Sequence, residues 1–307
     1  MNDIIVTENL TKHYKDVTAI SDISLNVRKG EIYGFLGLNG AGKTTTIRIL
    51  LGMIRPDSGN AYINGQKVDS NNLEMWTKAG YLVEVPYSYP NLTVRENLEI
   101  IRQLRAIDNK NCIDDIIEKL KLQPYANRIA KNLSLGNAQR LGLAKALIHK
   151  PEILILDEPT NGLDPAGIFE IRELLLDMAV NHGVTVFISS HILGEIAKLA
   201  TRIGIINEGK LIQEVDTSQL EKLCQKKLQV NTINFKMARS LLAQNGYLFT
   251  PSEDGVLESL NPELVNQPEK IASLLVNGGC PPTMLLVKEE DLESYFLRII
   301  GINGGTI

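Results

Sequence analysis

The chain has 307 residues, of which 44% are hydrophobic and 22% charged, so it is an ordinary globular protein long enough for one large domain and a smaller one. Its net charge of −4 lacks the basic excess of nucleic-acid-binding proteins, and no apolar run approaches the ~18 residues that span a bilayer. Three widely spaced cysteines indicate reduced thiols in a cytosolic protein, and the first residues lack the pattern of a signal peptide.

Apolar segments of strand length alternate with amphipathic helical segments through the first 215 residues. This alternation predicts an α/β fold with a mainly parallel sheet covered by helices. From about residue 94 to 150 the pattern is mostly helical, which predicts a helical subdomain inserted in this first domain. The expected strands are 31–36, 153–156 and 184–188, and residues 45–51 are expected to form a helix after the first of them.

From residue 216 onward the pattern changes to a helix followed by strand–helix units. We therefore predict a small accessory α/β domain over residues 216–307. Its last segment is an amphipathic helix with four apolar side chains on one face: Leu292, Tyr295, Phe296 and Ile299.

A glycine-rich segment, Gly37-x-x-x-x-Gly42-Lys43-Thr44, follows the first predicted strand. Its glycines let successive backbone amides converge on a phosphate, and the next helix adds its positive N-terminal end. Lys43 is then expected to reach the β- and γ-phosphates of ATP, and the Thr44 hydroxyl to ligate Mg²⁺. The residues predicted to contact the nucleotide in this segment are Leu38, Asn39, Gly40, Ala41, Gly42, Lys43, Thr44 and Thr45.

Two adjacent carboxylates, Asp157 and Glu158, follow the apolar strand at 153–156. A carboxylate at the end of a buried strand can approach Mg²⁺ through its water shell, which is the role predicted for Asp157. Glu158 is placed to polarise an attacking water as the general base. The alternative, two surface carboxylates at a strand end, becomes the weaker interpretation once the phosphate loop is present.

Several motifs together resemble one family, the ABC ATPases. Residues 133–140, Leu-Ser-Leu-Gly-Asn-Ala-Gln-Arg, are similar to its signature, whose usual form is Leu-Ser-Gly-Gly-Gln. Residues 161–164 resemble its D-loop, and His191 matches its switch histidine. Tyr14 falls where the family has an aromatic residue that stacks on adenine. The resemblance covers about residues 3–215 and keeps the order of every motif.

The resemblance implies the P-loop NTPase fold of an ABC ATPase, with the ATP-binding domain at residues 1–215. It also implies that ATP is held between two copies, so the chain is expected to be a homodimer in its ATP-bound state. Ser134 and Gly136 of one copy would face the γ-phosphate bound by the other, with Asp164 at the dimer seam. His191 would contact the γ-phosphate as a catalytic residue.

The sequence departs from the family pattern at the signature and at Glu84. Leu135 and Asn137 replace a glycine and the glutamine of the signature, but Gly136 keeps a close backbone approach to phosphate possible. Glu84 stands where most ABC ATPases have glutamine, in a loop that joins the Mg²⁺ site to the membrane partner. We include it among the predicted nucleotide and metal ligands. The alternative is an exposed loop glutamate whose charge is incidental.

Glu84, Leu135 and the C-terminal domain are similar to the ATPases of lantibiotic self-immunity and bacitracin-resistance exporters. The resemblance therefore implies the ATP-hydrolysing subunit of an exporter for a peptide antibiotic. It also implies a separately encoded integral-membrane permease and a cytoplasmic location, peripheral on the inner face of the cell membrane.

Three alternatives remain open. The exporter could carry another hydrophobic small molecule or a lipid. A soluble ABC ATPase acting on ribosomes or nucleic acid is disfavoured by the single set of motifs, the absence of heptad runs and the negative charge. A nucleotide kinase or GTPase would share only the phosphate loop.

Overall fold

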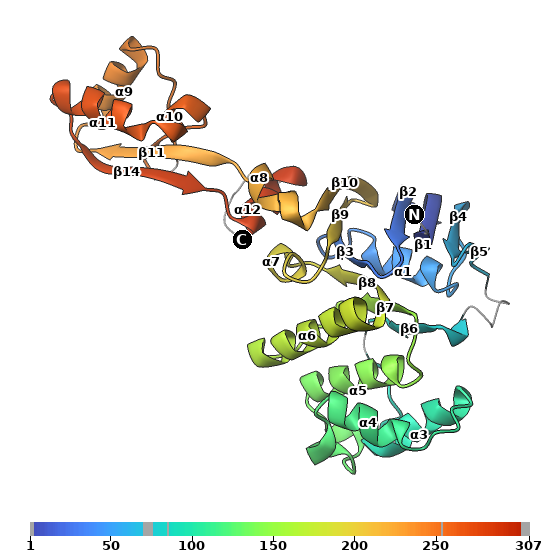
Figure 1. Cartoon of the computed structure of the whole chain (residues 1–307). Coiled ribbons are helices and arrows are strands. Elements are labelled where there is room, and N and C mark those ends of the chain that lie inside the picture. Colours follow the sequence, from blue (N-terminus) through green and yellow to red (C-terminus); the bar gives the residue numbers. More distant parts are fainter. Residues whose placement is uncertain (1–2, 70–75, 85, 253, 302–307) are drawn as a thin grey trace. The chain divides into compact units, whose positions relative to one another are not determined.

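The computed structural model describes residues 3–69, 76–84, 86–252 and 254–301 (Figure 1). Contacts divide the chain into two units, Met1–Thr217 and Ser218–Ile307, each with a core of its own. The described part of the first unit contains a six-stranded and a four-stranded sheet, and that of the second unit contains a four-stranded sheet.

The six-stranded sheet organises the first unit. Its order is β10-β9-β3-β8-β7-β6, and every neighbouring pair is parallel except β9 and β10. The central strands are buried along their whole length, as expected for a parallel sheet covered on both faces. The expected mainly parallel sheet is thus confirmed. The strands are β3 (Ile32–Leu36), β6 (Ala79–Leu82), β7 (Ile153–Asp157), β8 (Thr185–Ser190), β9 (Arg202–Asn207) and β10 (Lys210–Asp216).

An antiparallel sheet, which the sequence pattern did not predict, has the order β2-β1-β4-β5. Bulges shift the pairing of β1 with β2, and Asn9 and Asp22 have left-handed backbones there, so the apolar alternation of both strands is interrupted. The sheet shares a core with helix α1, in which Ile23 and Ile47 are both fully buried. The elements are β1 (Asp3–Tyr14), β2 (Val17–Arg28), β4 (Ser58–Ile63), β5 (Gln66–Lys67) and α1 (Lys43–Leu50).

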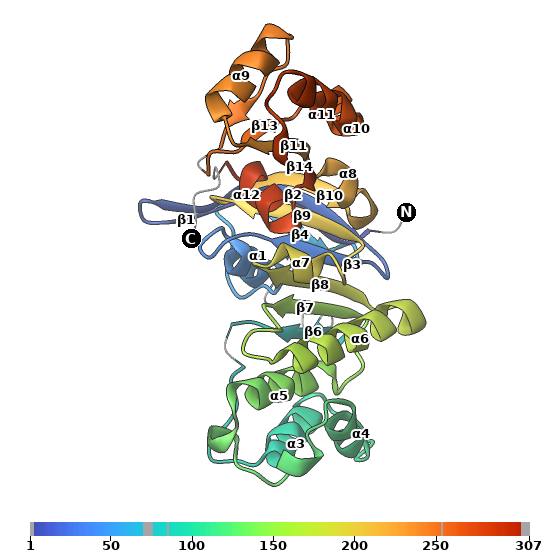
Figure 2. The same ribbon diagram turned by 90° about the vertical axis from the view of Figure 1, so that its left-hand side faces the viewer.

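Helices of the first unit cover the sheet and extend beyond β6 and β7. Figures 1 and 2 both show α5 lying between this end of the sheet and the pair α3 and α4. A capping box of Thr93 with Glu96 begins α3. The helices are α3 (Val94–Leu104), α4 (Cys112–Lys119), α5 (Leu135–Leu147), α6 (Pro165–His182) and α7 (Leu193–Ile196), with 3-10 turns at Gln123–Tyr125 and Ala130–Asn132. Another 3-10 turn, Thr217–Gln219, begins at the last residue of this unit.

The second unit packs helices on an antiparallel sheet of order β12-β13-β11-β14. Alternate residues of β11, such as Leu228 and Val230, are buried against Leu242 and Leu275 of the helices. This unit thus combines helices with strands. Its elements are α8 (Leu220–Leu223), β11 (Lys226–Thr232), α9 (Phe235–Gln244), β12 (Thr250–Pro251), β13 (Leu257–Ser259), α10 (Pro262–Asn266), α11 (Pro268–Asn277), β14 (Pro282–Glu289) and α12 (Leu292–Ile299).

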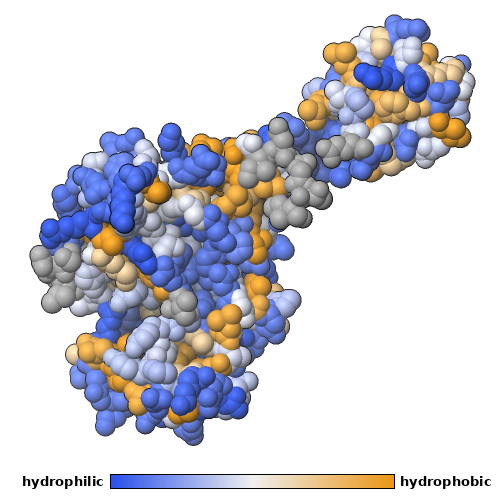
Figure 3. Space-filling model, turned by 180° about the vertical axis from the view of Figure 1, so that it is seen from behind, coloured by the Kyte–Doolittle hydropathy of each residue, from blue (hydrophilic) through white to orange (hydrophobic). Residues whose placement is uncertain are grey.

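The surface has the mixed character usual for a protein. Hydrophilic side chains cover most of the face of the first unit seen in Figure 3, with apolar patches between them. Within the described residues, no helix is both long enough and apolar enough to cross a membrane.

Candidate functional site

The loop between β3 and α1 has a backbone that only glycine allows at several positions. Gly40 and Gly42 have φ of 82° and 107°. A Cβ atom at Gly42 would lie 2.7 Å from the carbonyl oxygen of Ala19, and one at Gly37 would lie 2.5 Å from that of Ile206. At Gly40 a Cβ would meet nothing within 4 Å, so the top of the loop is open. The loop is therefore packed tightly against the protein at Gly37 and Gly42 and open to solvent at Gly40.

Lys43 lies inside this loop, at the start of α1, with its side chain buried. Its Nζ donates to the carbonyl oxygens of Gly37 at 2.6 Å and Leu38 at 3.2 Å, and lies 3.1 Å from a carboxylate oxygen of Glu158. Gly42 precedes α1 without a side-chain cap, which leaves the first backbone amides of the helix available to an anion. These features fit a bound phosphate chain.

Asp157 ends β7 and is 2% exposed. Its two carboxylate oxygens accept hydrogen bonds from Thr44 Oγ1 at 2.7 Å and Ser189 Oγ at 2.6 Å. One carboxylate and one hydroxyl side by side suit Mg²⁺, which takes few protein ligands and completes its shell with water and phosphate oxygens. In the described parts of the chain, no cluster of three or more His, Cys, Asp or Glu could hold a metal by itself.

Glu158 is fixed by contacts to both its backbone and its side chain. Its φ of 49° is in the left-handed region, which costs a non-glycine residue about 1 kcal/mol. Its N–H donates to Ser189 Oγ at 3.0 Å, and its carbonyl accepts from Gln139 Nε2 at 3.3 Å. The carboxylate lies 2.8 Å from His191 Nδ1. The structure thus places Lys43, Asp157, Glu158 and His191 together at one edge of the sheet.

The signature and the D-loop segment lie against each other. Ser134 is the N-cap of α5, with its Oγ accepting the N–H of Asn137 at 3.3 Å. A Cβ at Gly136 would lie 3.2 Å from the carbonyl oxygen of Gly162, and one at Gly162 would lie 2.4 Å from a methyl carbon of Leu135. The exposed Leu135 therefore packs on the D-loop of its own chain.

Asp164 caps α6, and its Oδ1 accepts the N–H of Gly167 at 2.9 Å. Among the residues that the structure describes, no hydrogen bond or ion pair joins Ser134 or Asp164 to the phosphate loop. These predicted residues form a second group beside the first. The other predicted loop residues, Leu38, Asn39, Ala41 and Thr45, lie between β3 and the first turn of α1.

Tyr14 and Glu84 lie outside both groups. Tyr14, at the end of β1, is 44% exposed. The ammonium group of Lys12 lies over its ring, 5.7 Å from the ring centre. The carboxylate of Glu84 pairs with Arg48 at 2.6 Å. Within the described ranges Arg48 is its polar partner, so the structure does not bring Glu84 to Thr44 or Asp157.

Residues 20–161 match the sequence model of the ABC transporter family. The chain is 44% identical to the bacitracin transport ATP-binding protein BcrA of Bacillus licheniformis, with 100% of both chains covered. It is 39% identical to BcrA of Enterococcus faecalis over 99% of this chain and 98% of that protein. The chain belongs to the ATP-binding proteins of ABC transporters.

Other members of the family match a smaller part of this ABC ATPase. The lantibiotic transport ATP-binding protein SrtF of Streptococcus pyogenes is 39% identical over 76% of the chain and 98% of SrtF. Among solved structures, the dimeric ATP-binding cassette MJ0796 bound to ADP and Pi has a TM-score of 0.65 and 26% identity, covering 70% of this chain and 99% of that one. The expected family and fold class are thus confirmed.

The structure adds two residues of the ABC ATPase site, and one partner of Glu84, that the sequence did not indicate. Ser189 bonds both Asp157 and Glu158, Gln139 supports the strained backbone of Glu158, and Arg48 binds Glu84. The position of Ser189, at the end of the strand beside β7, was a usable signal. The partners of the other two lie far away in the sequence, and no local pattern points to them.

Proposed function

We propose that this ABC ATPase powers the export of a peptide antibiotic of the bacitracin or lantibiotic type, for immunity or resistance. The observation that carries the proposal is the 44% identity to a bacitracin transport ATP-binding protein along the whole chain. Because that match includes the second unit as well as the ATPase unit, it is more specific than a likeness to ABC ATPases in general.

ATP binds at the open side of the phosphate loop. The uncapped amides of α1 and the ammonium group of Lys43 hold the β- and γ-phosphates, and the ring of Tyr14, which is 44% exposed, stacks on adenine. Thr44 and Asp157 would hold Mg²⁺, which would neutralise charge on the phosphate oxygens.

Glu158 acts as the general base. Its carboxylate accepts a proton from water as the water oxygen bonds to the γ-phosphorus and the bond to the β-phosphate oxygen breaks. His191, 2.8 Å from this carboxylate, holds it in position and reaches the γ-phosphate. Ser189 and Gln139 fix the backbone that carries the base.

A second copy of the chain completes the site. The N-terminus of α5, with the hydroxyl of Ser134 and the backbone of Gly136, presents hydrogen-bond donors and a positive helix end that suit a phosphate. Within the described residues those groups make no hydrogen bond to the phosphate loop of their own chain, and dimeric cassettes are among the solved structures that this chain resembles. In this proposal the ATP-bound protein is a homodimer, with Asp164 at its seam.

The permease, a separate integral-membrane chain, docks at a groove of about 490 Å³ between α1, β6 and the helices α3 and α5. Exposed apolar side chains gather along the groove, including Tyr87 (73% exposed) and Leu104 (75% exposed), and a contiguous surface of this kind suits a protein partner. The Glu84–Arg48 pair also lies there, and Arg48 is one helical turn from Thr44. Docking at this groove holds the ATPase at the cytoplasmic face of the membrane.

A resistance assay tests the proposal. The chain and the permease encoded beside it are expressed in an antibiotic-sensitive bacterium, and minimum inhibitory concentrations of bacitracin and a lantibiotic are measured. We expect a several-fold increase for one of them, lost with Glu158→Gln. Glu158-dependent efflux of a hydrophobic dye, with unchanged antibiotic sensitivity, would instead support export of other hydrophobic molecules.

A further inference from the structure

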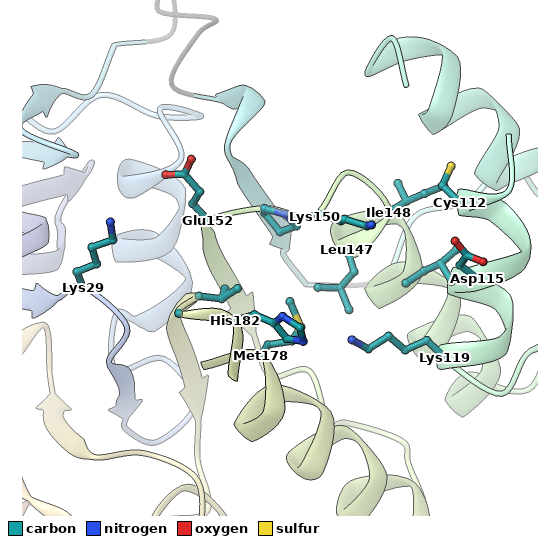
Figure 4. A pocket seen from close by; sticks show the side chains of 14 residues that line it. Lys29, Cys112, Asp115, Lys119, Leu147, Ile148, Lys150, Glu152, Met178 and His182 are labelled. Atoms are coloured by element: carbon teal, nitrogen blue, oxygen red, sulfur yellow. The ribbon is translucent and has the colours of Figure 1, made fainter. Parts of the chain in front are cut away.

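A cavity of about 660 Å³ opens at the amino ends of β7 and β8 (Figure 4). It lies at the opposite edge of the six-stranded sheet from the phosphate loop, since Asp157 ends the strand that Glu152 precedes. The five residues of β7 separate the two edges by about 17 Å. The walls come from α4, from the ends of α5 and α6, and from the turn before β3 that carries Lys29.

The floor of the cavity is apolar and formed by buried side chains. Its volume falls within the range of roughly 300–1,000 Å³ typical of small-molecule sites. One face of α4 contributes to it through residues three and four positions apart. The buried residues of the floor include Ile116, Leu147, Ile148, Pro151, Met178 and Val184.

Among the residues that line the cavity, lysines outnumber carboxylates, and Asp177, outside the lining, contacts Lys119 at 4.0 Å and His182 at 3.6 Å. Lys29, Lys119 and Lys150 contribute three cations, and Asp115 and Glu152 contribute two carboxylates. Glu152 is already paired with a lysine outside the rim, Lys78, at 3.3 Å. All five rim residues are exposed, as is His182 beside them.

The lysines of the rim differ in how far their charge is already paired. Within the described residues, neither Lys29 nor Lys150 has a carboxylate within 4.0 Å, and Lys119 has only Asp177, at 4.0 Å. Figure 4 shows Lys119 extending from α4 toward His182, with Leu147 between Lys119 and Lys150. Two ammonium groups thus lie on either side of an apolar contact surface.

We propose that this cavity binds a small amphiphile with one anionic head group, such as a long-chain carboxylate. The apolar body lies on the buried floor, where removal of its surface from water favours binding. The head group pairs with Lys150, which has no carboxylate within 4.0 Å among the described residues, and with Lys119, whose contact with Asp177 is 4.0 Å long. Asp115 on the same rim disfavours a ligand with several negative charges.

The test is a calorimetric titration of the full chain with dodecanoate, below the concentration at which it forms micelles. We expect one saturable site, with affinity reduced about tenfold in the Lys119→Gln/Lys150→Gln variant, a loss of ~1.4 kcal/mol. The matched control is Lys67→Gln/Lys210→Gln, which removes the same charge from exposed residues of β5 and β10 that do not line the cavity. It should bind as the wild type does.

A second variant, Met178→Trp, fills the cavity with a larger apolar side chain and should weaken dodecanoate binding at least tenfold. Its melting temperature and ATPase rate show whether it is folded. Wild-type affinity in Met178→Trp, equal affinities in the two lysine variants, or the absence of saturable binding would each overturn the proposal. So would equally tight binding of uncharged dodecanol, because the site would then not recognise an anion.

Discussion

The two edges of the six-stranded sheet are made by the same strands but differ in their chemistry. At the carboxyl edge, β3, β7 and β8 lead into the phosphate loop, Glu158 and His191, and α1 presents its positive N-terminus. At the amino edge, α5 and α6 present their negative C-terminal ends, beside Lys150 and His182. Because the parallel strands all point the same way, their carboxyl ends lie together at the phosphate-binding edge, while the cavity lies at the other edge among α4 and the ends of α5 and α6.

Removing the base at the carboxyl edge should have the largest effect. We expect Glu158→Gln to lower the ATP hydrolysis rate by about 10²–10⁴-fold, because the amide cannot accept the proton of the attacking water. Glu152→Gln, at the other end of β7, is the matched control and should stay within about twofold of the wild type. A similar loss of steady-state phosphate release in both variants would contradict the claim that hydrolysis takes place at the carboxyl edge alone.

A smaller loss is expected for His191→Ala, which removes the 2.8 Å contact that orients Glu158. The hydrolysis rate should fall roughly 10–100-fold, since the base remains but is no longer held in position. His182→Ala, at the amino edge, provides the control and should leave the rate unchanged. Equal hydrolysis rates for His191→Ala and wild type would show that His191 has no role in hydrolysis.

Glu84→Gln should alter coupling more than ATP binding. The substitution weakens the ion pair with Arg48, which links the proposed permease groove to α1, yet leaves Lys43, Thr44 and Asp157 in place. We expect nucleotide affinity within about twofold of wild type and transport in membrane vesicles reduced several-fold. If ATPase rate and transport were both unchanged, the charge of Glu84 would be incidental.

The smallest effect concerns stability at the amino edge. Burial, aided by nearby Arg105, lowers the pKa of His149 to about 4, although its Nε2 contacts the carbonyl oxygen of Ala79 at 3.1 Å. Below pH 6.5 His149 becomes protonated in the unfolded chain but stays neutral in the folded chain. The free energy of unfolding therefore decreases as the pH falls toward 4. Wild type should lose about 1 kcal/mol more than His149→Gln between pH 7 and 5, given the partial exposure of the ring.

Urea unfolding, followed by the fluorescence of the single tryptophan, Trp76, measures this difference. The same loss in both proteins between pH 7 and 5 would show that His149 does not titrate as its burial requires.

The sequence was sufficient for the parts of the structure whose chemistry is local. The phosphate loop and the Asp157–Glu158 pair are recognisable because the strand, the glycines and the acidic residues are contiguous. The antiparallel sheet was missed because bulges interrupt the alternation of β1 and β2. The ion pair of Glu84 with Arg48 could not be foreseen, because it depends on how β6 and α1 pack.

The most direct test of a site shared by two copies is gel filtration of the Glu158→Gln variant. With hydrolysis blocked, bound ATP should keep Ser134 of each copy on the γ-phosphate held by the other, so the variant should elute as a dimer. Without nucleotide, and with ADP, it should elute as a monomer. Elution as a monomer at saturating ATP would contradict the shared site.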